Sequence, residues 1–341
     1  MMNKKKEMEI RENVVTNSST RKSIGNKRSR SSNPVNVDRL TRKRARVEEH
    51  VSTQSTSGTV EGIRKFAEWI ARIGDGAIGD SSNGFATIEI PDDILLKYES
   101  DPIATIVRST YPGFPDIDDD PTYLEKRAIL APTLDVVDSI NQYMMSLNTR
   151  ESKTYFSSDS ACQSDTNADV LADVYTPEFL NSLKCSGVPN HELTLKIGTP
   201  VMLLRNIDHS MGLCNGTRLV ITRLGCHVLE AKILSGHTVG QKVLIPRLNL
   251  TPSDVRMPFK FQRRQFPIMV SYAMTINKSQ GQSLSHVGLF LKNPVFCHGQ
   301  LYVAVSRVTR REGLKILICN PDGASSNSTI NVVYPEVFQN V

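Results

Sequence analysis

The feature that most constrains the fold of this chain is a pair of nearly continuous apolar runs separated by a polar loop. The runs are Ile268–Met274 and Val287–Leu291, and the loop is Thr275–Ser283 (TINKSQGQS). Apolar runs without alternation are typical of strands buried on both faces, as in a parallel sheet covered by helices. Open α/β sheets bind ligands in loops at the carboxyl ends of such strands. Taken alone, this loop is explained equally well as an ordinary connection without a ligand.

A helix and a further strand follow the second apolar run. Within residues 297–310 (CHGQLYVAVSRVTR), apolar side chains recur at i, i+3, i+4 and i+7, which predicts one buried helix face. Arg307 lies off that stripe, so we expect it to point toward a partner. The strand Leu314–Cys319 comes next. Strands alternating with helices in this way predict an α/β fold with a parallel sheet.

Two segments resemble helicase motifs. TINKSQGQSL and GQLYVAVSRVTRREGLKIL resemble motifs V and VI of superfamily-one DNA helicases, in the PIF-one (petite integration frequency) branch, which includes the helicase of Helitron transposons and is related to RecD. The resemblance covers roughly residues 61–322. It implies the C-terminal half of an ATP-dependent 5′-to-3′ DNA helicase of the P-loop NTPase superfamily. Such enzymes act in DNA repair, recombination, and telomere or transposon maintenance.

The resemblance also implies roles for single residues. Arg307 matches the motif VI arginine, an arginine finger that contacts the γ-phosphate of ATP. Gln280 and Gly281 would face the nucleotide with it, and Gly281 lets backbone approach a ligand closely. The implied cofactors are ATP and Mg²⁺, and the implied partner is single-stranded DNA. Motif V residues that would contact this DNA are Thr275, Asn277, Lys278 and Ser279.

A strand and a helix upstream resemble the first unit of a RecA-like sheet. Residues 127–133 predict a short strand ending at Pro132, and the helix after it buries one face as far as Leu147. Thr133 fits the N-cap position of that helix. The segment resembles helicase motif IV, which would make Thr133 a DNA contact. A purely structural cap remains an equally good explanation.

Between these units the pattern changes to short strands. Residues 151–173 are polar and predict a surface loop. Four strand-like segments then follow, with Asn215-Gly216 and Ser235-Gly236 marking turns. They predict a small β-barrel and are Val201–Arg205, Thr217–Leu224, Val228–Leu234 and Lys242–Leu248. GTPVMLLRNID and GLCNGTRLVIT resemble the Src-homology-three-like 2B domain that helicases of this family carry as an insertion.

Basic and aromatic residues alternate in residues 256–266 (RMPFKFQRRQF). This interleaving suits a path for single-stranded DNA, with Arg263 and Arg264 on phosphates and aromatic rings on bases. A β-hairpin with an aromatic inner face and solvated arginines explains the same pattern. The family resemblance favours DNA contact at Arg263 and Arg264.

The phosphate-binding loop of ATPases is missing from the sequence. None of the 20 glycines is followed by lysine, so the pattern G-x-x-x-x-G-K-[ST] does not occur. No apolar strand ends in Asp-Glu, which would hold magnesium. Without these groups, ATP hydrolysis loses its main electrostatic stabilisation. We therefore expect the chain to be inactive alone, with another chain or an upstream segment supplying the first RecA-like domain. The alternatives are a non-catalytic single-stranded-DNA-binding module and a truncated transposon-derived remnant.

The basic balance of the chain comes from its start. Residues 1–50 hold 14 Lys and Arg against 6 Asp and Glu, so the remainder, with 27 basic and 29 acidic residues, has a net charge of −2. We expect this tail to be disordered, because it has few large apolar residues to bury. The dense cluster Arg39–Arg46 (RLTRKRAR) is typical of a nuclear localisation signal or a phosphate-binding arm, although a solvated tail also explains it. On this basis we expect a nuclear protein.

The remaining patterns set the domain boundaries and exclude some classes. An amphipathic helix over Gly62–Gly74 would close the first RecA-like domain, of which only a remnant is expected here. The six cysteines have no CxxC pair or zinc spacing, so we expect reduced thiols and no metal site. No apolar run approaches a membrane span of about 20 residues. The expected parts are a tail (1–60), a remnant and linker (61–125), the second RecA-like domain (126–322, with the barrel at about 175–260) and a C-terminal tail (323–341).

Overall fold

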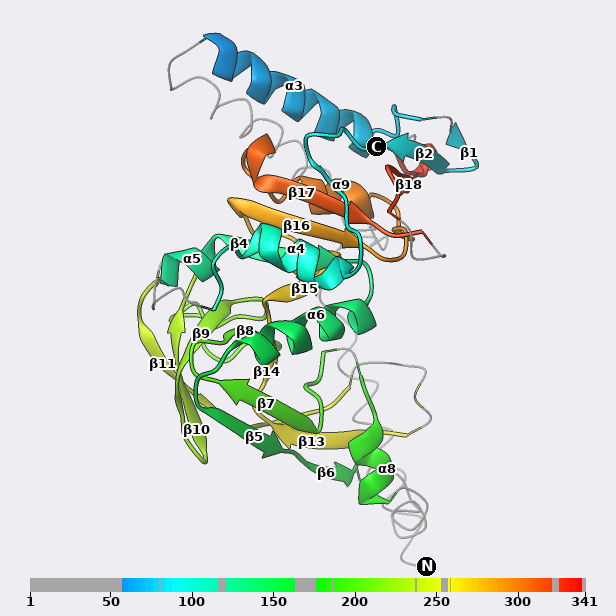
Figure 1. Ribbon diagram of the computed structural model, residues 1–341. Coiled ribbons are helices and arrows are strands. Elements are labelled where there is room, and N and C mark those ends of the chain that lie inside the picture. The colour runs from blue at the N-terminus through cyan, green and yellow to red at the C-terminus, as the bar shows by residue number, and fades with distance from the viewer. Residues whose placement is uncertain are drawn as a thin grey trace, which may run out of the picture. The chain divides into compact units, whose positions relative to one another are not determined.

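A computed structural model gives the fold of most of the chain (Figure 1). It describes residues 57–79, 81–115, 121–162, 176–185, 187–236, 238–252, 257, 259–320 and 325–338. The basic cluster Arg39–Arg46 and most of the expected N-terminal tail lie outside the described residues. The first helix within the described residues, α3, spans Ser57–Gly74 and ends at the glycine that the sequence predicted as its stop.

A five-stranded parallel sheet forms the centre of the structure, as predicted. Its order is β15-β4-β16-β17-β3, and every neighbouring pair is parallel. The strands are β15 (Ala273–Thr275), β4 (Arg127–Ala131), β16 (His286–Leu291), β17 (Leu314–Ile318) and β3 (Leu95–Leu96). Because all run the same way, their carboxyl ends meet at one edge.

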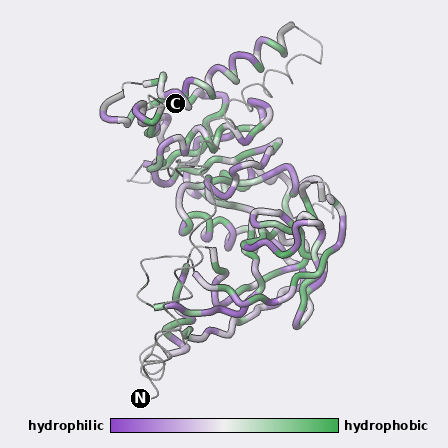
Figure 2. Tube along the Cα trace, turned by 180° about the vertical axis from the view of Figure 1, so that it is seen from behind, coloured by the Kyte–Doolittle hydropathy of each residue, from purple (hydrophilic) through white to green (hydrophobic). Residues whose placement is uncertain are grey.

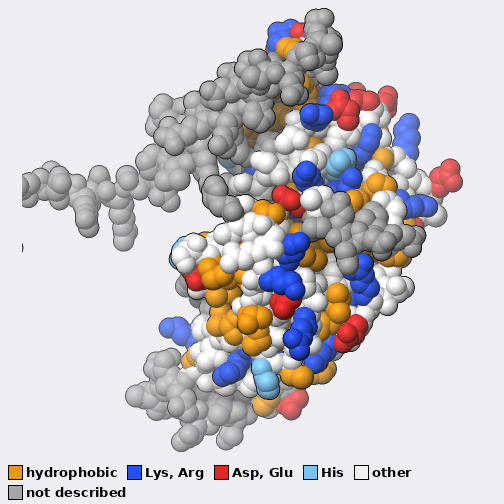
Figure 3. All heavy atoms as spheres, turned by 90° about the vertical axis from the view of Figure 1, so that its left-hand side faces the viewer, with side chains coloured by type: hydrophobic (Ala, Val, Ile, Leu, Met, Phe, Trp, Pro, Cys, Tyr) orange, Lys and Arg blue, Asp and Glu red, His pale blue; other side chains and the backbone are white. Residues whose placement is uncertain are grey.

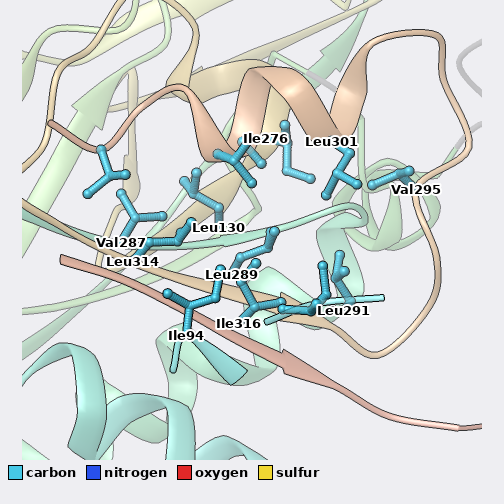
Figure 4. Close-up of a cluster of buried hydrophobic side chains, with 14 of the residues drawn as sticks. Ile94, Leu130, Ile276, Val287, Leu289, Leu291, Val295, Leu301, Leu314 and Ile316 are labelled. Atoms are coloured by element: carbon cyan, nitrogen blue, oxygen red, sulfur yellow. The ribbon is translucent and has the colours of Figure 1, made fainter. Parts of the chain in front are cut away.

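Helices cover both faces of this sheet, which explains the continuous apolar runs. Helices α4 (Pro102–Thr110) and α6 (Leu134–Leu147) pack on one face, while α3 and α9 (Gln300–Val305) pack on the other. Strand side chains alternate between two buried clusters. Figure 4 shows Leu130, Leu289 and Ile316 from three neighbouring strands meeting Leu301 of α9. Figure 2 shows hydrophilic and hydrophobic residues alternating along α3, as expected of an amphipathic helix.

The run Ile268–Met274 is not one strand of the parallel sheet, contrary to the prediction. Its first part, β14 (Ile268–Val270), pairs antiparallel with β8 (Pro200–Leu203) in the barrel, and only the last part enters the parallel sheet as β15. Both parts lie in hydrophobic cores, so the composition of the run could not show that the chain passes from one sheet to the other at Tyr272.

The inserted barrel forms with the four predicted strands. Strands β8, β9 (Arg218–Leu224), β10 (Val228–Ile233) and β11 (Lys242–Pro246) join β14 in a five-stranded antiparallel sheet. A second pair, β5 (Ser152–Phe156) and β7 (Glu192–Lys196), shares its hydrophobic core.

Residues 151–173, predicted as a surface loop, contain two strands in their described part. They are β5 and β6 (Ser158–Ala161). β6 joins β13 (Phe261–Gln265) and β12 (Leu248–Leu250) in a three-stranded sheet. Alternate residues of these polar strands are exposed, so the strands lack the apolar content that marked the others. The short helix α8 (Pro177–Ser182) begins at Thr176, whose hydroxyl caps it.

Segments from the two halves of the described chain meet in another three-stranded antiparallel sheet. Strand β2 (Phe85–Glu89) pairs with β1 (Ser81–Ser82) on one side and with β18 (Ser328–Val332) on the other. The C-terminal tail expected from residue 323 is therefore ordered at β18, because its strand buries Val332 against the main core. The remaining elements are α5 (Pro121–Glu125) and the 3-10 helices η1 (Ile276–Ser279), η2 (Arg311–Gly313) and η3 (Pro335–Phe338).

One buried arginine joins the barrel to the parallel sheet. The guanidinium of Arg218, on β9, donates to the carbonyl oxygens of Glu125 (3.1 Å), Arg127 (3.1 Å) and Ser271 (3.3 Å). Burial lowers the pKa of Arg218, because the charged form loses its hydration. Among the helices in the described ranges, none has the length and apolarity needed to cross a membrane.

Candidate nucleic-acid interface

The carboxyl edge of the parallel sheet brings together two predicted site residues from distant parts of the sequence. Thr275 ends β15 and pairs with Ala131 of β4, so Thr133 lies just past the same edge. The Thr275 hydroxyl accepts a hydrogen bond from the backbone N–H of Lys278 (3.4 Å) and caps η1. The polar loop therefore starts as a short, fixed turn.

The residues of this turn differ in what they can contact. The side chain of Asn277 is exposed, as are Gln280 and Gly281. Gly281 has a φ of 89°, a left-handed conformation that favours glycine. Ser279 is fully buried, and its hydroxyl donates to the carbonyl of Ile276 (2.6 Å). The expectation that Ser279 contacts DNA is therefore wrong for its side chain, which holds the turn instead.

Lys278 lies half-buried beside a second cation. Burial lowers the pKa of the Lys278 ammonium, and the nearby charge of Arg205 lowers it further. Arg205 follows β8 in the barrel and donates to the carbonyl of Thr251 (3.0 Å). Within the described part of the chain, neither cation forms an ion pair with an acid. The pair therefore attracts anions such as phosphate.

Sequence reasoning missed Arg205 as a site residue. Its only signal in the sequence was its place in GTPVMLLRNID. That segment resembles the family's barrel, and the resemblance does not predict a role for the Arg205 charge. Arg205 lies near Lys278 because the chain passes from the barrel to the parallel sheet at Tyr272, which comes between the two residues in the sequence.

Thr133 occupies the N-cap position of α6 in backbone terms only. Its φ and ψ of −120° and 155° are extended, but its side chain accepts no hydrogen bond from the helix N–H groups. Within the described residues, its buried hydroxyl has no hydrogen-bond partner, although it lies close enough to Asp135 to lower the pKa of that carboxyl. The structural-cap explanation thus does not account for the Thr133 side chain.

Arg307 does not point outward, contrary to the prediction. Only 4% of the surface of Arg307 is exposed to solvent. The Nε atom donates to the carbonyl of Val303 (2.9 Å), and one Nη donates to the Ser306 hydroxyl (2.8 Å). The helix spacing placed Arg307 correctly off the apolar stripe, but it could not show that the guanidinium folds back on its own helix.

The two helicase-like motifs are held together by side-chain and backbone hydrogen bonds. Arg307 donates to the carbonyl of Gln282 (3.4 Å), one residue after Gly281, and its own carbonyl accepts from the N–H of Leu284 (2.9 Å). The Gln282 amide reaches the carbonyl of Gly216 in the barrel (3.4 Å). Since α9 runs back between two parallel strands, Arg307 lies at the amino edge of the sheet, opposite Thr133 and Thr275.

Arg263 and Arg264 point to opposite sides of β13. Arg263 is fully buried and forms an ion pair with the buried Asp159 (2.6 Å). It also donates to three backbone carbonyls, those of Leu180, Leu183 and Pro189. Arg263 therefore cannot contact DNA, and the prediction for it is wrong. Neither reading of the sequence allowed for a buried arginine.

Arg264 is exposed on the outer face of the same sheet. It pairs across the strands with Asn249 on β12 and Ser158 on β6. Arg264 therefore remains a candidate phosphate contact. Figure 3 shows that Lys and Arg side chains on one face of the molecule lie among hydrophobic and uncharged atoms, without a single continuous basic surface.

Comparison with known proteins identifies the barrel. Residues 178–224 match the family model described as the 2B domain of DNA helicase Pif1. These residues are similar to the 2B domain of Pif1 helicases. The matched residues include α8, β7, β8 and β9, together with Arg205 and Arg218.

Curated relatives agree with this assignment. The ATP-dependent DNA helicase PIF1 of Homo sapiens is 33% identical over 148 residues, which are 42% of this chain and 22% of the relative. The ATP-dependent DNA helicase PIF1 of Rattus norvegicus is 32% identical over 166 residues, which are 48% of this chain and 25% of the relative. The Pif1 helicase of Bdellovibrio bacteriovorus is 30% identical over 154 residues, 45% and 34%. The 2B match and these relatives support a Pif1-like helicase C-terminal region, which spans about a quarter of the two mammalian proteins.

Solved Pif1 structures are also similar. Pif1 helicase from Candida albicans has a TM-score of 0.48 and 22% identity, covering 77% of this chain and 56% of that one. Bacteroides Pif1 bound to ssDNA has a TM-score of 0.41 and 24% identity, covering 55% and 40%.

Proposed function

We propose that this chain is the C-terminal motor half of a Pif1- and Helitron-like 5′-to-3′ DNA helicase and binds single-stranded DNA. The observation that carries the proposal is the unneutralised cation pair Lys278 and Arg205, next to the turn that begins at Thr275. Phosphates on this pair would relieve the repulsion between the two cations. The relatives named as ATP-dependent DNA helicases support the same function.

The DNA path would follow the carboxyl edge of the parallel sheet. Thr275, Asn277 and Thr133 offer hydrogen-bonding groups there, and Lys278 offers charge. Arg264 would add a phosphate contact on the barrel. Hydroxyl and amide contacts of this kind fix a strand without reading its sequence, which suits a motor that moves along any DNA.

The nucleotide site is incomplete within this chain. Arg307 would reach ATP only after leaving its bonds to Val303 and Ser306, and Gln280 and Gly281 would lie beside it. The sequence holds no phosphate-binding loop. In the described residues, no group of three or more His, Cys, Asp or Glu could hold a metal such as Mg²⁺. Without a phosphate-binding loop, the chain would hydrolyse ATP only with a partner or upstream segment that supplies the first RecA-like domain.

A helicase half of this kind would act in DNA repair, recombination, or telomere or transposon maintenance. The basic cluster Arg39–Arg46 would direct it to the nucleus. The alternative is a non-catalytic single-stranded-DNA-binding module or a truncated transposon-derived remnant. The inward-turned Arg307 and the absent phosphate-binding loop favour this alternative for the isolated chain.

The test is DNA binding and ATP turnover by the purified chain. We expect a fluorescein-labelled oligo(dT) to bind, with an affinity that falls as salt rises. Lys278→Ala with Arg205→Ala should weaken binding and reduce the salt slope by up to about two phosphate contacts, because each contact releases counterions. Arg223→Ala, at an exposed arginine on β9, is the matched control and should change the slope least.

The outcomes separate the two functions. An unchanged slope in the double variant would contradict the DNA site. Turnover of ATP by the chain alone, lost on Arg307→Ala, would contradict the incomplete nucleotide site. DNA binding without turnover fits both the motor half and the binding module. Turnover restored by adding a first RecA-like domain, and abolished by Arg307→Ala, would decide for the motor half.

A further inference from the structure

A group of exposed aromatic side chains lies outside the site described above. Phe85 is 47% exposed, Phe296 is 58% exposed and Tyr334 is 37% exposed. Phe85 precedes the body of the parallel sheet in sequence, Phe296 follows β16, and Tyr334 follows β18. We propose that Phe85, His298 and Tyr334, here called the aromatic platform, stack against bases of single-stranded DNA. The proposal rests on the DNA-binding function proposed above and extends its path.

The rings of the platform stand in series. Phe85 and Tyr334 meet edge to face, with ring centroids 6.3 Å apart and planes at 89°. His298 stacks on the other side of the series, 5.9 Å from the Tyr334 ring and at 20° to it. The Nδ1 atom of His298 also accepts a hydrogen bond from the backbone N–H of Tyr334 (3.0 Å). The rings are therefore held in place before any ligand binds.

Backbone contacts fix the platform from both ends of the chain. Phe85 lies opposite Val332 in the pairing of β2 with β18. The N–H of Gly299 donates to the Val332 carbonyl (2.9 Å), and the Gln300 side chain accepts from the N–H of Phe296 (3.0 Å). Gly84 allows the ring of Tyr334 to lie close to the backbone, because a Cβ there would be 2.5 Å from a ring carbon.

The platform continues the edge that carries the proposed DNA path. The loop of residues 292–299 leaves the carboxyl end of β16, and β16 neighbours β4, whose end carries Thr133. The charge of Lys292 in this loop contributes to the lowered pKa of Asp135, which places the start of the loop near the beginning of α6. A strand crossing Thr275 and Thr133 would therefore reach the platform next.

The chemistry of the platform favours bases over phosphates. Its side chains are aromatic and carry no fixed charge, and the acid Glu336 lies two residues from Tyr334. Every nucleobase has a flat π-face, so aromatic side chains bind single strands without sequence preference. Rigid rings lose little conformational freedom on binding. The cations at Lys278 and Arg205 would hold the backbone, and the platform would hold the bases.

The experiment compares an oligo(dT) with an oligomer of the same length whose central positions are abasic. Tyr334→Ala should weaken oligo(dT) binding about 5- to 150-fold, the loss expected for one stacked base. Its affinity for the abasic oligomer should not change. The salt slope should also stay the same, because stacking releases no counterions. Tyr334→Trp, which keeps a stacking face, should retain oligo(dT) affinity.

Controls separate the platform from folding and from the DNA function itself. Leu244→Ala removes a side chain that is 65% exposed on the barrel and should leave both affinities unchanged. Should Tyr334→Ala fail to fold, Phe85→Ala tests the same series of rings at a more exposed position.

Equal losses on both oligomers, or no loss on either, would overturn the platform. Loss of oligo(dT) binding in the Lys278 and Arg205 variant, with none in the platform variants, would overturn the platform alone. No binding of either oligomer by the unaltered chain would overturn both proposals.

Discussion

Replacing Arg263 by Met should destabilise the barrel severely. All the donor nitrogens of the buried guanidinium are used, on both oxygens of Asp159 (2.6–3.1 Å) and on the carbonyls of Leu180 (2.8 Å), Leu183 (3.1 Å) and Pro189 (3.0 Å). Arg263→Met would leave the Asp159 carboxylate buried without its partner. Breaking a buried ion pair in this way costs about 3–5 kcal/mol.

The adjacent arginine gives a matched control. Arg264→Met removes the same charge from the exposed face of β13, so it should change the free energy of unfolding by less than about 0.5 kcal/mol. Urea unfolding followed by circular dichroism measures both variants. Hydrogen exchange in residues 176–185 and 187–190 shows whether the loss is local, because this segment supplies the three carbonyls that Arg263 bonds.

A second substitution isolates the ion pair. Asp159→Leu with Arg263→Met removes both charges, and the double variant should lose less stability than the two single variants together. A loss below about 1 kcal/mol for Arg263→Met, or strict additivity in the double variant, would refute the view that this pair holds β6, β13 and α8 together.

Further predictions concern the parallel sheet and α3. Gly288→Ala should cost about 1–3 kcal/mol or more in thermal unfolding, since its Cβ would lie 2.1 Å from the Thr110 hydroxyl oxygen. Gly62→Ala, with nothing within 4 Å, should stabilise α3 by about 0.5–1 kcal/mol. If both substitutions changed the free energy of unfolding in the same direction, the packing described here would be contradicted. A hydrogen bond from Arg311 lowers the pKa of Asp93, so this link stabilises the fold above the usual Asp pKa and is lost as pH falls through the lowered value. Arg311 also lies 6.0 Å from the ring of Trp69, the single tryptophan, so acidification below about pH 4 should shift its emission, and Arg311→Ala should abolish that shift.

The sequence predicted the elements that are buried on both faces. Val287–Leu291 and Leu314–Cys319 were recognisable because a strand between two helical layers needs apolar side chains at every position. Strands β5 and β6 were missed because alternate residues in them are exposed and they carry Ser, Asp and Lys. The path from β14 to β15 could not be read from an apolar run, since two different cores accept the same residues.

The candidate site was predicted in part for a similar reason. The sequence placed Thr275 and Thr133 each after a strand, and the structure brings them to one edge because those two strands are parallel neighbours. The orientation of single side chains depends on tertiary contacts that no local pattern contains. Arg263 turns inward because Asp159 lies across the strand pair, and Arg307 folds back onto the carbonyl of Val303.

The hydrogen bonds of Arg218 make the contact between barrel and sheet sensitive to substitution at this one position. Its three acceptors are backbone carbonyls, which any amino acid at positions 125, 127 and 271 would provide. Substitutions at those three positions would keep the carbonyl acceptors and so the contact between barrel and sheet. Arg218 cannot, because no other side chain offers forked donors at that reach. After random mutagenesis and selection for folded protein, we therefore expect substitutions at positions 125, 127 and 271 but not at Arg218.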